Sequence, residues 1–317
     1  MLRLDGCDRV HVRSDPSLAI SPRPLGKFID RVTLLNVRQE SKSAPQRSRT
    51  ATCSRCATIE AIAACRTAET SRTSPTQVNK SLIPKIIWQT YRTRDLPREA
   101  FKAQKSWKKQ NPNWEYQFCD DIEIGAFMDR EYGGELARLF HSLPLGVMKA
   151  DLWRYAVLYK YGGVYTDIDT TCLVPLGSWQ MRWETLRVAL ENRLHFCQWT
   201  IAAAPGHPVL RAVLQLIVKR KRRRMSTSYP HFVHQYTGPG VWTDAIRTAL
   251  GVSSSLSAAE IYQAHRHRAE KKGVLLLPPL SFEGWFVHHA FASTEYSTRQ
   301  YVSWRTERKK LAPSTRR

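Results

Sequence analysis

Two aspartates separated by one residue, Asp167 and Asp169, offer the clearest chemistry in this sequence. They end a run of β-branched and aromatic residues, Gly163 to Asp169, that is typical of a buried strand. On an extended strand the two side chains would share one face, about 6–7 Å apart at their Cα atoms. Two unpaired carboxylates repel each other and are costly to desolvate. A hard divalent cation, shared with the phosphates of a substrate, would compensate these charges.

The helix expected before this strand must help to position the pair. Residues 151–161 carry apolar side chains at helical spacing and are followed by Gly162, which predicts an amphipathic helix with a glycine stop. Asp151 and Arg154 are three residues apart and therefore lie on one helical face. Their spacing also fits a surface salt bridge, and a lone Asp-x-Asp is most often a solvated turn after a strand. The residues alone leave both alternatives open.

The neighbourhood of the pair resembles the DXD sugar-binding glycosyltransferases. The matching residues are, in order, Ala150 to Tyr155 (ADLWRY), Tyr161 to Tyr165 (YGGVY) and Asp167 to Asp169 (DID). The block from Phe196 to Pro208 resembles the fungal initiation-specific alpha-1,6-mannosyltransferases in particular. The likeness covers about residues 83–292 and implies a GT-A-type α/β fold that binds a nucleotide sugar.

The resemblance also implies roles for single residues. Asp167 and Asp169, together with His289, would hold Mn²⁺ or another divalent cation against the diphosphate of GDP-mannose. Asp151 and Arg154 would hydrogen-bond the hydroxyls of the transferred sugar, which makes these two and the aspartate pair the catalytic residues. Further donor contacts are expected from a set of aromatic, polar and turn residues: Trp88, Tyr165, Gln198, Thr237, Gly238 and Pro239.

Several of these residues have an equally plain structural explanation. Trp88 would stack on the nucleotide base, or it is a core tryptophan of the first strand. Gln198 and Trp199 would face donor or acceptor, or they pack within the sheet.

Two glycines, Gly238 and Gly240, flank Pro239 and allow a positive φ or a close approach of the backbone to a ligand. An ordinary loop-to-helix turn explains the glycines as well. Thr243 or Asp244 would cap the helix that follows and point its N-terminus at the cleft, where an anion is favoured.

The order of elements predicts a mostly parallel α/β sheet covered by helices on both faces. A strand within residues 82–90 is followed by a helix over 97–110, with Trp107 inward, and by a strand over 114–119. Asp120 or Asp121 would cap the next helix. Nucleotides bind beyond the carboxyl ends of such strands, where the aspartate pair falls.

The composition is that of a globular protein, with 42% hydrophobic and 24% charged residues, but the net charge is +22. Such a charge fits nucleic acid, an anionic membrane surface and anionic substrates alike. The basic run from Lys219 to Arg224 is interpreted as a solvated face. Contact with an anionic membrane is the alternative for this run, and nucleic-acid binding is not favoured.

The chain is expected to divide into three parts. Residues 1–80 form a basic disordered segment, residues 81–304 the transferase domain, and residues 305–317 a basic tail. No apolar run in the sequence approaches the roughly 18 residues that span a bilayer. The first residues do not form a clear signal peptide. The resemblance nevertheless implies a Golgi membrane location.

The function implied by the resemblance is a metal-dependent, retaining transfer of mannose from GDP-mannose to a glycan or glycolipid acceptor. Alpha-1,6-mannosylation of N-glycan outer chains is the preferred hypothesis. A sister inositol-phosphoceramide mannosyltransferase, a galactosyltransferase and a non-catalytic basic binding protein are the alternatives. After His289 the family usually continues with Gly-Ser-Trp, whereas this sequence has Phe291-Ala292-Ser293-Thr294. The loop that closes over the leaving diphosphate is therefore expected to differ.

Overall fold

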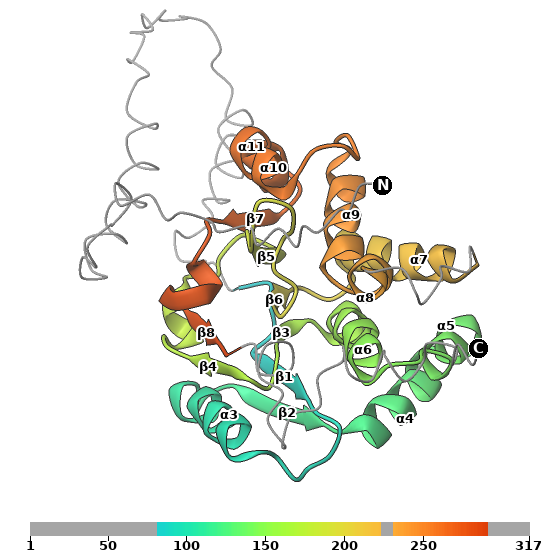
Figure 1. Ribbon diagram of the computed structural model, residues 1–317. Coiled ribbons are helices and arrows are strands. Elements are labelled where there is room, and N and C mark those ends of the chain that lie inside the picture. Colours follow the sequence, from blue (N-terminus) through green and yellow to red (C-terminus); the bar gives the residue numbers. More distant parts are fainter. Residues whose placement is uncertain (1–80, 223–230, 291–317) are drawn as a thin grey trace, which may run out of the picture. The chain divides into compact units, whose positions relative to one another are not determined.

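The structure is a computed structural model that describes residues 81–222 and 231–290 (Figure 1). These residues belong to the unit Ser74–Arg317, one of two into which the chain divides. The predicted disordered segment, the basic tail and the altered loop after His289 lie outside the described residues. Within the described ranges, none of the helices combines the length and the apolar character that crossing a bilayer requires.

The described residues form a six-stranded sheet with the order β2-β1-β3-β6-β5-β7. Strand β1 pairs in parallel with β2 and β3, and β5 pairs in parallel with β7, whereas β6 is antiparallel to both of its neighbours. The predicted α/β fold, with a mostly parallel sheet flanked by helices, is thereby confirmed. The strands are β1 Ile86–Thr90, β2 Glu115–Cys119, β3 Gly163–Thr166, β5 Leu186–Ala189, β6 Thr200–Ala203 and β7 Val274–Leu277.

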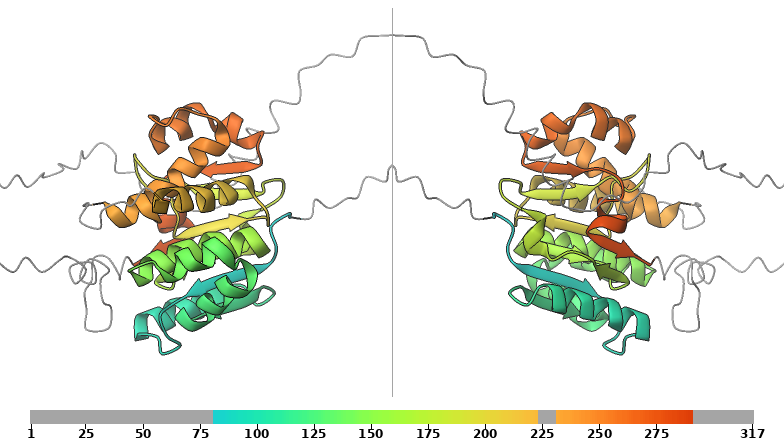
Figure 2. Two further views of the ribbon diagram at one scale, coloured as in Figure 1. Left: turned by 90° about the vertical axis from the view of Figure 1, so that its right-hand side faces the viewer. Right: turned by 90° about the vertical axis from the view of Figure 1, so that its left-hand side faces the viewer.

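Both faces of this sheet are covered (Figures 1 and 2). On one face, α6, α7 and α9 enclose an apolar core that includes Trp153, Tyr155 and Trp242. On the other face, α3 and the short helical turns η2 and η3 pack around Trp107, Trp179 and other apolar side chains. The helical elements are α3 Arg98–Gln110, α4 Asp121–Glu131, α5 Gly134–His141, α6 Gly146–Tyr161, η2 Leu176–Trp179, α7 Pro208–Arg222, α8 Phe232–Tyr236, α9 Pro239–Leu250, α10 Ala258–Ala264, α11 Arg266–Glu270 and η3 Ser281–Trp285.

The first elements follow the sequence-based expectation closely. Strand β1, helix α3 and strand β2 lie within the predicted ranges, and Trp107 is fully buried. Asp120 is the N-cap of α4 and forms a capping box with Glu123. Of the two predicted capping aspartates, Asp121 is instead the first residue of the helix.

A second, two-stranded sheet joins distant parts of the chain. Strand β4, Thr170–Cys172, follows the aspartate pair directly and is antiparallel to β8, Val287–His289. In this register Thr170 lies opposite His289. The pairing therefore carries a histidine from near the end of the described chain to the end of β3.

Helix α6 confirms the predicted helix and its glycine stop, since Gly162 follows it with a φ of 67°. The predicted amphipathic character is wrong, because every residue from Asp151 to Leu158 is buried. The helix lies between the sheet and the neighbouring helices α4, α5 and α7, so it has little face left for solvent. Asp151 and Arg154 are consequently inside the protein, where charges must pair with each other.

Gly163 makes the turn from α6 into β3 possible. Its φ is 102°, and a Cβ atom at this position would lie 2.5 Å from the carbonyl oxygen of Ile86. Only glycine tolerates both the backbone angle and this approach to β1. The glycine therefore fixes how closely α6 and β3 pack beside the first strand.

Helix α9 differs from the prediction at its start. It begins at Pro239, with Gly238 as the N-cap, so Thr243 and Asp244 lie in its second turn and do not cap it. Neither Gly238 nor Gly240 has a positive φ. Neither position has room for a side chain, because a Cβ atom at either would crowd the backbone of α8 at His234.

Candidate active site

Asp167, Asp169 and His289 form a cluster in which one ligand atom of each residue lies within 4.8 Å of the others. The two aspartates lie in a turn after β3 and not on an extended strand, so that part of the prediction is wrong. The turn closes because the amide of Thr170 donates to the carbonyl of Asp167 at 3.2 Å. Two carboxylates and an imidazole that converge in this way are a suitable ligand set for a divalent cation.

The imidazole of His289 is held from two sides. Its Nε2 lies 3.1 Å from Asp169 Oδ1, and its ring stacks on Trp199 with 4.5 Å between ring centroids. Both side chains of the His289–Asp169 pair are only 7% exposed. Burial lowers the pKa of His289, but the charge and hydrogen bond of Asp169 outweigh it, and the net shift is upward. The neighbouring His288 is exposed.

Asp167 is the more open of the two aspartates, with a side chain 24% exposed. Its Oδ1 accepts hydrogen bonds from the Tyr165 hydroxyl at 2.6 Å and from Arg154 at 3.0 Å. Burial raises the pKa of Asp167, Arg154 lowers it, and the negative charge of Asp169 raises it again; the net direction is upward. A bound divalent cation would relieve this crowding of negative charge.

Asp151 and Arg154 form the buried base of this site. Asp151 is fully buried; its Oδ2 accepts from Thr237 Oγ1 at 2.8 Å, and its Oδ1 from Gln198 Nε2 at 3.2 Å. Arg154 lies 3.2 Å from Asp151 and bridges it to Asp167. The predicted shared helical face is thus present. Because both oxygens of Asp151 are engaged within the protein, its predicted contact with a sugar would require Thr237 or Gln198 to give way.

The other predicted donor contacts are near this base or packed in the core. The hydroxyl of Tyr155 lies within hydrogen-bond distance of two acceptors, Gln198 Oε1 and the carbonyl oxygen of Thr237, which places both residues against α6. Trp88 donates from its indole nitrogen to the carbonyl of Gly162 at 2.8 Å and stacks on Tyr161. Packing accounts for Trp88, and its stacking on a base stays a prediction. The same holds for direct donor contacts of Gly238 and Pro239.

Tyr91 and Arg92 are residues that the sequence did not single out. They follow the carboxyl end of β1 and line an open hollow of about 350 Å³ that continues to Arg98. Burial raises the pKa of Tyr91, and the charge of Asp169 adds to the rise, so this ring lies near the carboxylate cluster. The rule that ligands bind beyond the carboxyl ends of strands could have found this segment.

Glu191 is a second residue that the sequence analysis did not assign to the site. It follows β5, and burial raises the pKa of its carboxyl to about 7. Its charge interacts with those of His289, Asp167 and Arg154, which are members of the site. The same rule about strand ends could have drawn attention to it.

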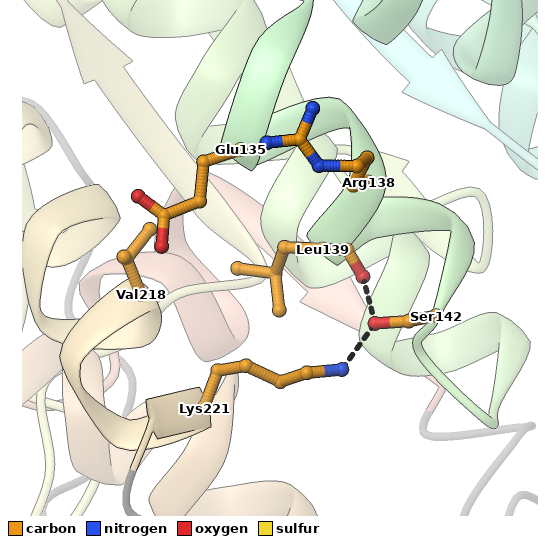
Figure 3. A pocket seen from close by; sticks show the side chains of 6 residues that line it. All are labelled: Glu135, Arg138, Leu139, Ser142, Val218 and Lys221. Atoms are coloured by element: carbon orange, nitrogen blue, oxygen red, sulfur yellow. Dashed lines mark hydrogen bonds between the residues drawn. The ribbon is translucent and has the colours of Figure 1, made fainter.

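A larger hollow of about 510 Å³ lies between α5 and α7, away from the predicted site residues (Figure 3). Among the residues that line it are Arg138, Ser142 and Lys221, and Lys221 donates to the Ser142 hydroxyl.

The basic run begins on α7, where Arg220 is paired with Asp244 and is not simply solvated. The residues of that run beyond Arg222 lie outside the described part, so its predicted contact with an anionic membrane stays a prediction.

Residues 97–186 match the family model described as the glycosyltransferase sugar-binding region containing DXD motif. The chain is 35% identical over 194 residues to the initiation-specific alpha-1,6-mannosyltransferase of Schizosaccharomyces pombe, an alignment that covers 53% of this chain and 49% of the relative. It is 31% identical over 170 residues to inositol phosphoceramide mannosyltransferase 3 of the same organism, an alignment that covers 50% of this chain and 43% of the relative.

Among solved structures, the PaToxG glycosyltransferase superimposes with a TM-score of 0.46 at 21% identity, covering 61% of this chain and 78% of that one. The chain spans about half the length of the curated relatives that it matches. The resemblance to DXD glycosyltransferases noted in the sequence is confirmed by the family model and by these relatives.

Proposed function

We propose that this chain is a metal-dependent, retaining glycosyltransferase that moves mannose from GDP-mannose to a glycan acceptor. The convergence of Asp167, Asp169 and His289 at the carboxyl edge of the sheet carries the proposal. Two relatives of Schizosaccharomyces pombe, an alpha-1,6-mannosyltransferase and an inositol phosphoceramide mannosyltransferase, support mannose as the sugar. Alpha-1,6-mannosylation of N-glycan outer chains, and with it a Golgi location, is the specific form that we favour, by analogy to the first of them.

Asp167, Asp169 and His289 would hold the cation, which we propose to be Mn²⁺. Bound there, a divalent ion would neutralise charge on the departing diphosphate. The protein keeps these ligands in position: Tyr165 and Arg154 fix the carboxylate of Asp167. Because preorganised groups need no reorientation during the reaction, such a fixed set favours the charged transition state.

Arg154 would contribute a second positive charge to the site. Its guanidinium is 3% exposed and lies 3.0 Å from Asp167, so its field acts in a poorly hydrated environment where charges interact strongly. Asp151 would hold Arg154 from below, together with Thr237 and Gln198, and keep the guanidinium directed at the site. This combination supports a catalytic role for the Asp151–Arg154 pair even with Asp151 enclosed by protein.

The nucleoside end of the donor would extend toward the hollow at Tyr91 and Arg92. This hollow adjoins the carboxylate cluster through the interaction of Tyr91 with Asp169. Arg92 is exposed and offers a cation to the diphosphate, while Tyr91 offers a ring to the base. The acceptor hydroxyl would then attack the anomeric carbon on the face that the diphosphate leaves, with the leaving phosphate oxygen taking the proton.

The test uses the full-length chain and a panel of nucleotide sugars, with and without Mn²⁺. We expect donor hydrolysis and transfer from GDP-mannose only when the cation is present. At 100 times its dissociation constant Mn²⁺ should stabilise the fold by about 2.7 kcal/mol, which raises the melting temperature by about 5–10 °C.

The variant Asp167→Asn with Asp169→Asn should lose both turnover and the Mn²⁺-dependent rise in melting temperature while keeping the circular dichroism spectrum of the wild type. Turnover equal to that of the wild type in this variant would refute the assignment. No turnover of any donor by the wild type, with salt-sensitive binding to polyanions, would favour a non-catalytic basic protein instead.

One finding favours a second acceptor. The relative of Schizosaccharomyces pombe named inositol phosphoceramide mannosyltransferase 3 is nearly as similar to this chain as the alpha-1,6-mannosyltransferase is, at 31% against 35% identity. Transfer to inositol phosphoceramide in detergent micelles, compared with transfer to a mannose-terminated glycan under the same conditions, decides between the two acceptors.

A further inference from the structure

A carboxyl group that the proposed mechanism does not use lies at the same edge of the sheet. Strand β6 separates β3 from β5 and is antiparallel to both, so the start of β6 lies beside the ends of its neighbours. On one side Asp167 donates its amide to the carbonyl of Trp199 at 2.9 Å. On the other side Cys197 donates to the carbonyl of Ala189 at 2.9 Å, two residues before Glu191. Asp167 and Glu191 thus flank one short segment.

The carboxyl of Glu191 is poorly satisfied by the protein. Its Oε2 is buried, and among the described residues no hydrogen-bond donor lies within reach of it. A buried polar atom without a partner is costly, and native proteins rarely keep one without a reason. The residue as a whole is partly exposed, but Oε2 itself is covered, so a sugar hydroxyl would reach this oxygen only after small shifts of the side chains around it.

The other carboxylates of the site are already engaged. Both oxygens of Asp151 accept hydrogen bonds from protein groups, and Asp167 accepts from Tyr165 and Arg154. Asp169 is bonded to His289, and these two with Asp167 are the proposed metal ligands. A hexose has several hydroxyls that each require an acceptor when water is excluded. Glu191 is a carboxylate of this edge with an oxygen to spare for one of them.

The charges around Glu191 are those that would surround the sugar. His289 and Asp167 belong to the proposed cation site and Arg154 to the buried base, while Glu283 is an exposed residue of η3, which packs on the face of the sheet away from α6. A carboxylate oxygen that has no protein partner can accept a hydrogen bond from a sugar hydroxyl.

We propose that Glu191 hydrogen-bonds a hydroxyl of the sugar that is being transferred, and so holds the anomeric carbon in place beside the diphosphate. The inference rests on the proposed glycosyltransferase function and adds to it a residue that contacts the donor sugar but not the nucleotide. It predicts a selective defect. Loss of the Glu191 carboxyl should weaken interactions with the sugar and leave those with the nucleotide and the cation unchanged.

The experiment compares Glu191→Gln and Glu191→Ala with the wild type in full-length protein. Because Oε2 has no protein partner, Glu191→Gln should keep the wild-type melting temperature. We expect kcat/KM for hydrolysis and for transfer to fall about 10- to 100-fold in Glu191→Ala and less in Glu191→Gln, as for loss of a hydrogen bond to a charged group. Calorimetry with Mn²⁺ should give an unchanged Kd for GDP and a weaker one for GDP-mannose.

Glu283→Gln is the matched control, because Glu283 is an exposed acid that interacts with Glu191 through charge alone. It should resemble the wild type. Wild-type kinetics in both Glu191 variants would overturn the inference and leave the proposed function standing. An equal loss of affinity for GDP and GDP-mannose, or an equal defect in Glu283→Gln, would also overturn it. A wild type that neither binds nor turns over any nucleotide sugar would overturn the proposed function and this inference with it.

Discussion

Replacing Arg154 with methionine should destabilise the fold strongly, because it removes the positive partner of two carboxylates inside the protein. Arg154 is 3% exposed and Asp151 fully buried, and the two groups lie 3.2 Å apart. Asp167 is 3.0 Å from the same guanidinium, and the ring of Tyr165 lies 4.7 Å from it. Breaking a buried ion pair by deleting one partner costs about 3–5 kcal/mol, so we expect a loss of that size at pH 8.

The loss should depend on pH in a defined direction. Burial raises the pKa of Asp151, and the charge of Arg154 is the largest of the influences that lower it in the wild type; the net direction is upward. In Arg154→Met the pKa of Asp151 should therefore rise further above its value in the unfolded chain. A carboxyl whose pKa is higher in the folded state binds a proton on folding, so its contribution is favourable at low pH and is lost as the pH rises through the folded pKa. The deficit of the variant should be smaller at pH 5 than at pH 8.

Urea unfolding at the two pH values, with the slope m checked for constancy, measures both effects. Adding Asp151→Asn to Arg154→Met should recover part of the loss at pH 8, because a neutral amide replaces the unpaired charge. Lys102→Met is the surface control: Lys102 is 56% exposed in its ion pair with Glu99 and should matter by less than about 0.5 kcal/mol. A loss below about 1 kcal/mol at both pH values, without rescue, would refute the buried network as a source of stability.

Two further predictions concern the scaffold. Burial lowers the pKa of His207 to about 4, and its Nδ1 accepts a hydrogen bond from the amide of Val209. As the pH falls, the unfolded chain therefore binds a proton before the folded protein does, and the free energy of unfolding should drop by about 3 kcal/mol between pH 6.5 and 4. Urea unfolding of His207→Asn, which keeps an acceptor for that amide, should lack this drop; an equal drop in the variant and the wild type would contradict the argument. Gly163→Ala should lower the free energy of unfolding by about 3 kcal/mol or more, because its Cβ would lie 2.5 Å from the carbonyl oxygen of Ile86. Gly177→Ala, whose Cβ meets no atom within 4 Å, should stay within about 1 kcal/mol in the same assay, and equal losses in the two variants would contradict the steric argument.

Local patterns in the sequence determined much of the secondary structure and drew attention to the aspartate pair. Strand β1, helix α3 and the glycine stop after α6 were predictable, because periodicity, caps and breakers act between residues that are near in the chain. The mostly parallel α/β fold follows from the order of these elements. Asp167 and Asp169 could be proposed as cation ligands only through the resemblance, because the two residues alone fit a solvated turn as well.

Only the tertiary structure decided how these residues meet. Sequence periodicity cannot distinguish a solvent-facing Asp151 and Arg154 from a buried pair, because the distinction depends on which elements cover α6. The pairing of β4 with β8 brings His289 to Asp169 across 120 residues of chain, a contact that no local pattern encodes. Likewise only the strand order, with β6 between β5 and β3, brings the end of β5 and Glu191 near Asp167, because strand order is fixed by packing over long distances along the chain.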